Sequence, residues 1–172
     1  MNFRGARLDQ TTVSGMTPIM AAAAQGHIET VMFLADQGAS IEWKDKNDQT
    51  IIHLAAQNNQ DEVIKAILDL ESTPKDFMVN ENDQLDNTPL HLACTAGHID
   101  SVKVLIQVIF ASHWSKLYIL ASYWSIHTHF SLDQAGAESD NKNEDEKTPF
   151  HMAAERGHVE VVEYILNNDK NA

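Results

Sequence analysis

Residues 88–98 read Thr-Pro-Leu-His-Leu-Ala-Cys-Thr-Ala-Gly-His, and this stretch recurs in recognisable form three more times along the chain. The other copies begin at Thr17, Thr50 and Thr148. Three of the four copies reach a Gly-His pair nine residues after the Thr, whereas the second copy reads Asn59-Gln60 there. A segment that recurs in this way predicts an array of similar units rather than one packed domain.

Each copy has the pattern of a helix start. A Thr hydroxyl caps free amide groups, contributing about 1 kcal/mol, and in three of the four copies a Pro at the next position is already set for the first helical turn. The His three residues after the Thr is expected to hydrogen-bond between adjacent turns. This repeat signature comprises Thr17, Pro18, Thr50, His53, Thr88, Pro89, His91, Thr148, Pro149 and His151.

Two columns of small residues follow the cap and would let neighbouring helices approach closely. They are Ala22, Ala55, Ala93 and Ala153, then Ala23, Ala56, Cys94 and Ala154. A second helix is expected after the Gly-His turn, because three apolar columns also align there. They are Ile28, Ile99 and Val159, with Asp61 departing; Val31, Ile64, Val102 and Val162; and Leu34, Ile67, Leu105 and Ile165. Such short helices become stable only by stacking on neighbours.

The step of 33 residues from Thr17 to Thr50, with a helix-turn-helix in each unit, resembles the ankyrin repeat family. The resemblance covers residues 12–107 and 135–172 and implies an all-α solenoid with hairpin tips. The family's Gly two residues before the Thr is present as Gly15 but is replaced by Asp48, Asp86 and Glu146. Because Asp tolerates left-handed backbone better than Glu, Glu146 is expected to be strained or to alter its turn.

The spacing divides the chain into predicted repeats. Residues 1–11 are the tail of a truncated preceding repeat, because Gly5-Ala6 lies 12 residues before Thr17, as Gly38-Ala39 does before Thr50. Repeat 1 takes 12–44, repeat 2 takes 45–82 with a lengthened loop at 71–75, repeat 3 takes 83–107 plus 135–142, and repeat 4 takes 143–172. The sequence stops before a further hairpin, so we expect a piece of a longer array.

The step from Thr88 to Thr148 is 60 residues, and the surplus of 27 falls on residues 108–134. This insertion holds six aromatic residues and two charges. One interpretation is a transmembrane span from Val104 to Ile126, although Gln107, His113 and Lys116 interrupt it. A second is a binding element, because aromatic and apolar residues from Phe110 to Trp124 follow helical spacing. The third, which we favour, is a retained intron, since 27 codons preserve the frame and Val and Gln codons fit intron borders.

Composition limits the function. With 25 acidic and 12 basic side chains the formal charge is −13, which disfavours nucleic acid and favours basic or neutral partners. Six of the nine histidines belong to the repeat, and His113, His127 and His129 show no metal-ligand spacing with other His or Cys. Cys94 is expected to be a buried thiol in a reducing compartment. We therefore expect no enzyme activity, cofactor or metal.

Function is expected on the hairpin tips, near residues 42–49, 81–87 and 141–147, which in ankyrin arrays form a concave surface with the first helices. Trp43 is either packed on the neighbouring hairpin or an interface anchor. The predicted contacts to a protein partner, or to neighbouring repeats of the same parent chain, are Trp43, Lys44, Lys46, Glu81, Asn82, Asn141 and Lys142. No nucleic-acid or membrane contact is expected, and the oligomeric state is left open.

The run from Thr17 to Gly97 is also similar to the cytoplasmic array of ankyrin-type transient receptor potential channels. The resemblance rests on Ser40-Ile41-Glu42-Trp43-Lys44-Asp45, on Ile52-His53-Leu54-Ala55 and on the lengthened loop before Thr88. It implies a cytoplasmic scaffold that belongs to a cation channel. The alternative is a soluble ankyrin adaptor unrelated to ion transport.

Deleting residues 108–134 should raise the melting temperature and the solubility and leave the helix content per repeat unchanged. The reason is that an apolar stripe holding Trp114 and Trp124 would be an aggregation patch, whereas closing the long loop costs only about 1 to 2 kcal/mol. Thermal melts of both forms, together with transcripts from the source tissue, check this. A deletion that unfolds the last repeat, or transcripts that always retain the segment, would favour the binding element.

Overall fold

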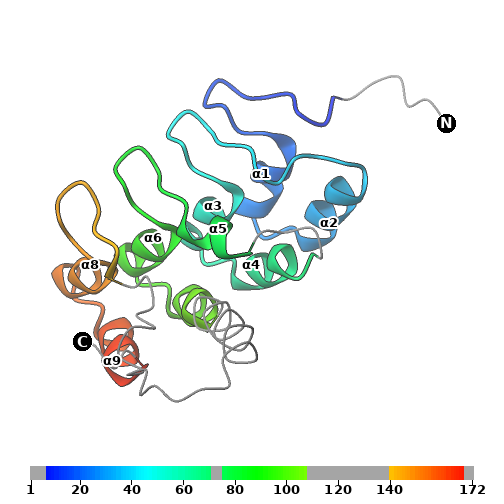
Figure 1. Cartoon of the computed structure of the whole chain (residues 1–172). Helices are drawn as coiled ribbons and strands as arrows, with labels where there is room; N and C mark the ends of the chain where they lie inside the picture. Colours follow the sequence, from blue (N-terminus) through cyan, green and yellow to red (C-terminus); the bar gives the residue numbers. More distant parts are fainter. Residues whose placement is uncertain (1–6, 71–74, 108–139, 169–172) are drawn as a thin grey trace, which may run out of the picture.

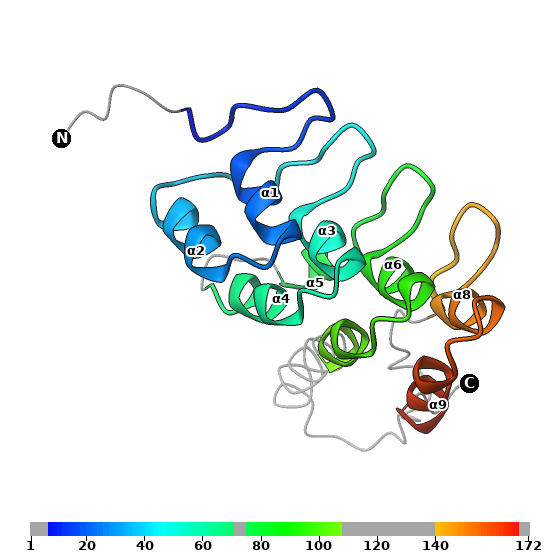
Figure 2. The same cartoon turned by 180° about the vertical axis from the view of Figure 1, so that it is seen from behind.

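The computed structural model describes residues 7–70, 75–107 and 140–168, and in these ranges the chain forms helices and turns without a strand. One row of helices holds α1 (Pro18–Ala24), α3 (Ile51–Gln57), α6 (Pro89–Ala96) and α8 (Pro149–Glu155). A second row holds α2 (Ile28–Asp36), α4 (Asp61–Leu68), the helical residues 99–107 and α9 (Val159–Asn168). The hairpins stand side by side beyond the first row (Figures 1 and 2). The predicted all-α solenoid is confirmed, and we number its helix pairs repeat 1 to repeat 4 in chain order.

Small residues form the contacts between first-row helices. Ala55, Ala93 and Ala153 are fully buried where α3 packs on α1 and α6 and where α6 packs on α8. Cys94 is equally buried, and burial raises the pKa of its thiol. Ala154 lies in the same column as Cys94 but is exposed, contrary to expectation. The reason is that no further first-row helix covers α8 in the described part of the chain.

The second-row helices bury most of two of the three predicted apolar columns, although Leu34 and Val162 in these columns are only partly buried. Val31, Ile64 and Val102 are fully buried in one column, and Ile67, Leu105 and Ile165 are buried in the other. The prediction for the third column is wrong at its ends, because Ile28 is 36% exposed and Val159 is 64% exposed. Ile99, at the same position in an inner repeat, is half-buried, so the exposure of Ile28 and Val159 follows from their place in the outermost described repeats.

A short helix that the spacing did not predict, α5 (Lys75–Asn80), precedes the third hairpin. Met78 and Val79 are buried, and α5 packs against α6. The predicted loop at 71–75 is therefore wrong at Lys75, because this apolar pair gives the segment a side to bury; residues 71–74 lie outside the described ranges. The insertion at 108–134 also lies outside them, and no described helix is long and apolar enough to cross a bilayer.

The hairpin turns keep one geometry in spite of their different residues. Asp48, Asp86 and Glu146 have φ of 59°, 57° and 60°, and Gly15 has φ of 88°. The amide of Glu146 still donates to the Asn143 carbonyl at 2.9 Å, as Asp86 does to Asp83 at 3.1 Å. The turn at Glu146 is thus unaltered, and its cost is confined to a left-handed φ that favours glycine.

A buried histidine connects each inner repeat to the next one. In repeat 2 the Thr50 amide donates to His53 Nδ1 at 3.2 Å, and His53 Nε2 lies 3.0 Å from the Asn87 carbonyl oxygen. His91 repeats both bonds, from Thr88 at 3.2 Å and to Lys147 at 3.0 Å. Because Nδ1 accepts, the proton must lie on Nε2 and the ring must be neutral. The predicted bonds between adjacent turns are present for His53 and His91, whereas in the described part of the chain His151 bonds only Thr148 of its own repeat.

The histidines after the turn glycine make a second set of bonds between repeats. His98 Nε2 lies 3.1 Å from the Gln57 carbonyl oxygen, and His158 Nε2 lies 3.0 Å from that of Thr95. The His158 ring also lies directly over Gly97, where a Cβ atom would collide with it. In repeat 2 the corresponding residue is Gln60, which covers Gly26 in the same way. Each glycine at this turn therefore provides the space into which the next repeat fits.

The first helix of repeat 1 lacks the predicted Thr cap. Thr17 is 1% exposed and its hydroxyl has no hydrogen-bond partner, so the cap expected there is absent. The cause is Met20, which stands where the other three repeats have a His that bonds the Thr. An unpaired buried hydroxyl is unfavourable, and the Gln49 carbonyl lacks the histidine donor that the Asn87 carbonyl has.

Met20→His should raise the free energy of unfolding by about 1 kcal/mol, because it supplies the missing partner of Thr17 and a donor to Gln49. Urea unfolding followed by circular dichroism measures this change. Met20→Leu is the matched control, since it keeps the side chain apolar and repairs neither bond. An equal or lower stability for the His variant would show that Met20 packing outweighs the two bonds.

The fold should lose stability as the pH falls from 7.5 to 5.5. Burial lowers the pKa of His53 and His91 below the usual value near 6.5, although the bonds to Asn87 and Lys147 oppose this. The unfolded chain therefore binds more protons than the folded chain below that pH, and each histidine removes up to about 1.4 kcal/mol per pH unit.

Urea unfolding at the two pH values checks this prediction. The control is the double variant His53→Gln, His91→Gln, in which Gln retains a capping partner and does not titrate. Its stability should change less between the two pH values than that of the parent chain. An identical change in both proteins would assign the pH dependence to other groups.

Candidate functional site

Hydrogen bonds from backbone to backbone join the four hairpin tips in a row. The amide of Lys46 donates to the Ser14 carbonyl, that of Gln84 to Asn47 and that of Glu144 to Leu85, each at 3.0 Å. The Gln84 side chain adds a bond to the Lys46 carbonyl at 2.8 Å. These bonds fix the distance between successive tips, so side chains on different hairpins belong to one surface.

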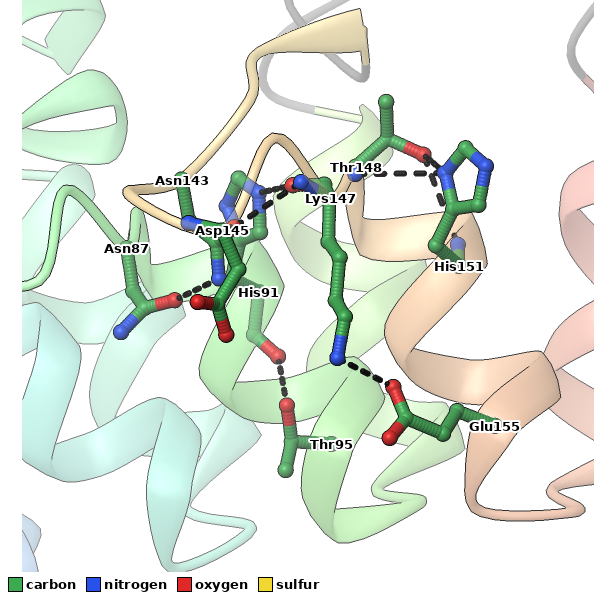
Figure 3. Close-up of polar contacts among 9 residues, drawn as sticks. All are labelled: Asn87, His91, Thr95, Asn143, Asp145, Lys147, Thr148, His151 and Glu155. Carbon is green, nitrogen blue, oxygen red and sulfur yellow. Dashed lines mark hydrogen bonds and ion pairs between the residues drawn. The ribbon is translucent and has the colours of Figure 1, made fainter.

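A buried polar residue holds each of the last three tips in shape. Asp83 Oδ1 accepts from the amides of Leu85 and Asn87, each at 2.9 Å, and Asp45 and Asn143 do the same in their hairpins. Asn143 Nδ2 also donates to Asn87 Oδ1 at 2.9 Å, which links two hairpins through side chains (Figure 3). Because these groups are satisfied internally, only the residues that project from the tip are available to a partner.

The predicted contact residues divide into paired and available side chains. Trp43 is 40% exposed at its tip. Lys44 forms an ion pair with Glu81 on the next hairpin, and the Glu81 side chain is only 11% exposed. Lys142 pairs with Glu146 in its own turn at 3.1 Å. Asn141 is half-buried, whereas Asn82 and Lys46 are exposed. The residues most open to a partner are therefore Trp43, Lys46 and Asn82.

The sequence analysis did not identify two exposed apolar residues at the tips. Leu85 is 58% exposed and Val13 is 90% exposed, each in a turn next to the backbone ladder. The signal was present, because Leu85 occupies the tip position that is polar in the other three repeats, at Ser14, Asn47 and Asp145. We define the tip surface as Val13, Trp43, Lys46, Asn82 and Leu85.

Below the tips, Lys147 reaches down the face of the first-row helices to Glu155 on α8. Their charged atoms are 2.7 Å apart (Figure 3). This bond raises the pKa of Lys147 and lowers the pKa of Glu155, so both groups stay charged near neutral pH. The pair is exposed and can exchange with charges of a partner.

No group of three or more His, Cys, Asp or Glu in the described ranges has the arrangement of a metal site. In His53 and His91, Nδ1 accepts from the Thr amide of the same repeat and Nε2 bonds a carbonyl of the next repeat, so both ring nitrogens are engaged in structural bonds. The arrangement favours recognition by shape, hydrogen bonds and charge.

Comparison with known proteins agrees with this architecture. The family model for ankyrin repeats in three copies matches residues 2–78 and 44–116, and the single ankyrin repeat model matches residues 145–172.

Several curated proteins are similar to the chain over most of its length. The transient receptor potential cation channel subfamily A member 1 of Homo sapiens is 29% identical over 94% of this chain and 15% of its own length. Its homolog in Caenorhabditis elegans is 26% identical over 87% of this chain and 12% of its own length. The E3 ubiquitin-protein ligase XBAT32 of Arabidopsis thaliana is 28% identical over 88% of this chain and 29% of its own length. The chain thus spans less than a third of each of these relatives, and on the family models it belongs to the ankyrin repeat family.

Proposed function

We propose that this chain is a non-enzymatic scaffold that binds a protein partner through the tip surface and the adjoining face of the first-row helices. The observation that carries the proposal is the hydrogen-bonded row of hairpin tips, which presents Trp43 and Leu85 to solvent on a rigid support. Exposed aromatic and apolar side chains on a pre-organised surface are typical anchors of protein interfaces.

The charge of the chain indicates the chemistry of the partner. A formal charge of −13 favours a basic or neutral protein surface and disfavours nucleic acid. Exposed carboxylates stand at the turns, at Asp48, Asp86 and Glu146, beside the apolar tip residues. A partner that places an apolar side chain between basic residues would complement this pattern.

We further propose that the parent protein is an ankyrin-type transient receptor potential channel and that the chain belongs to its cytoplasmic part. Similarity to two such channels supports this, but similarity to a ubiquitin ligase supports the alternative of a soluble adaptor. The genomic sequence downstream of Ala172 distinguishes them, because six hydrophobic spans would favour the channel. An antibody raised against the chain gives the same distinction, since a channel requires detergent for extraction from membranes.

A photo-crosslinking amino acid at Asn82 should capture a partner in extracts of the source tissue, whereas the same group at Lys65 on α4 should not. Both residues are exposed, but only Asn82 lies on the tip surface. Trp43→Ala should then weaken binding of the purified partner by about thirtyfold, the effect of losing an interface anchor worth roughly 2 kcal/mol.

Val159→Ala is the matched control, because Val159 is an exposed apolar residue in the second row. It should leave the affinity unchanged. If Trp43→Ala lowers the melting temperature but not the affinity, the indole packs on the neighbouring hairpin and is not an anchor. Capture at Lys65 alone would move the binding surface to the second-row helices.

A further inference from the structure

The last three hairpins each present three consecutive exposed residues at the tip. They are residues 46–48 before Thr50, 84–86 before Thr88 and 144–146 before Thr148, and we call them the tip row. The tips at 46–48 and 84–86 have a hydrogen-bonded hairpin on both sides, and their side chains are exposed like those at 144–146. Exposure in the tip row is therefore a property of the hairpin and does not depend on which repeats lie beside it.

The negative charge of the tip row increases in one direction. Lys46-Asn47-Asp48 carries no net formal charge, Gln84-Leu85-Asp86 carries one negative charge, and Glu144-Asp145-Glu146 carries three. Leu85 lies between the other two tips, because the Gln84 amide donates to the Asn47 carbonyl and the Glu144 amide donates to the Leu85 carbonyl, each at 3.0 Å. The row thus has a neutral end, an apolar middle and an acidic end.

Most lysines on these hairpins are already paired with carboxylates. Three of the four lysines in 42–49, 81–87 and 141–147 form ion pairs: Lys44 with Glu81, Lys142 with Glu146 at 3.1 Å and Lys147 with Glu155 at 2.7 Å (Figure 3). Glu144 and Asp145 form no ion pair with any described residue. These two carboxylates therefore present uncompensated negative charge on the tip that follows Leu85.

The spacing of the tips suits an extended polypeptide. Packed helices lie about 8 to 10 Å apart, and hydrogen bonds tie each hairpin to the next one at the same step. An extended chain advances about 3.3 Å per residue, so every third residue of such a chain reaches the next tip. A side chain placed on Leu85 therefore has its neighbours three and four residues away beside Glu144 and Asp145.

We propose, on the basis of the protein-binding function proposed above, that the tip row binds an extended basic segment of the partner. An apolar side chain of this segment packs on Leu85, and two basic side chains three and four residues away pair with Asp145 and Glu144. On the other side of Leu85 the tip has no net charge, so basic residues are required on one side only. Complementary charge fixes the register and the direction of the segment on the row.

Fluorescence anisotropy with the purified whole chain and two labelled peptides tests this proposal. The peptide Lys-Lys-Ser-Ser-Leu-Ser-Ser-Lys-Lys, called the spaced peptide, has a basic pair at the required distance on both sides of Leu and so fits in either chain direction. The control peptide Lys-Lys-Leu-Ser-Ser-Ser-Ser-Lys-Lys has the same composition and charge but lacks this spacing. The spaced peptide should bind about tenfold more tightly, because only it engages Leu85 and both carboxylates at once.

Charge variants locate the basic side chains. The double variant Glu144→Gln, Asp145→Asn should weaken binding of the spaced peptide by about tenfold, since it removes two exposed ion pairs. The double variant Glu160→Gln, Glu163→Gln is the matched control, because it changes the net charge equally at exposed positions on α9. The control variant should bind like the parent chain.

A variant of Leu85 tests the apolar contact. Leu85→Asn introduces the residue that Asn47 provides at the same position of the preceding tip, so the turn should keep its shape. This variant should bind the two peptides equally, because the preference depends on the leucine. All variants change exposed side chains and should melt like the parent chain, which circular dichroism verifies.

Three results would overturn the proposal. They are equal affinity of the parent chain for the two peptides, no binding of the spaced peptide at about 1 mM, and equal weakening by both charge variants. The last result would assign binding to the formal charge of −13 on the whole chain. If a photo-crosslinker at Asn82 still captures a partner, any of these results removes the basic segment alone and leaves the protein-binding function in place.

Discussion

The structure depends on a neutral histidine that accepts from its own repeat and donates to the next one. The Thr50 amide fixes His53 Nδ1 as an acceptor, and this leaves Nε2 as the donor to the Asn87 carbonyl. One ring thereby caps a helix and sets the position of the following hairpin. Because short helices are marginal alone, stability comes from these contacts between neighbours. Where the ring is absent, at Met20, a buried Thr hydroxyl has no partner.

The same constraint determines which residues are available for recognition. Buried groups such as Asp83, Asn87 and Asn143 satisfy one another and hold the hairpins in register. The outer sides of the tips therefore take little part in the packing of the stack. Trp43 and Leu85 project into solvent there. A surface of this kind can vary its side chains without disturbing the stack, which suits a binding module.

In a linear array each repeat packs only on its neighbours, so the outermost described repeats have one uncovered side. His151 and Gly157 have the local geometry of their counterparts in inner repeats, but their side towards the next repeat is open. Equivalent residues therefore have different exposure according to position in the stack.

The sequence by itself determined the repeat fold, the register and the role of the histidines, because Thr-Pro-x-His spacing and small-residue columns are local requirements of each unit. It also located the left-handed turn positions, including Glu146. Among the proposed contact residues, Trp43 was singled out because an aromatic residue stands at a tip position that is not aromatic in the following repeats, and Leu85 is likewise an apolar residue at a tip position that is polar in the other repeats.

Only the tertiary structure decided which members of each column are buried, since burial depends on the neighbour and not on the residue. Ala154 and Cys94 lie in the same column, but Ala154 is exposed and Cys94 is buried. The ion pair of Lys44 with Glu81 joins two hairpins, so neither residue's own repeat could reveal it. The helix α5 falls outside the repeat pattern, and its buried Met78 and Val79 became interpretable only once their contact with α6 was known.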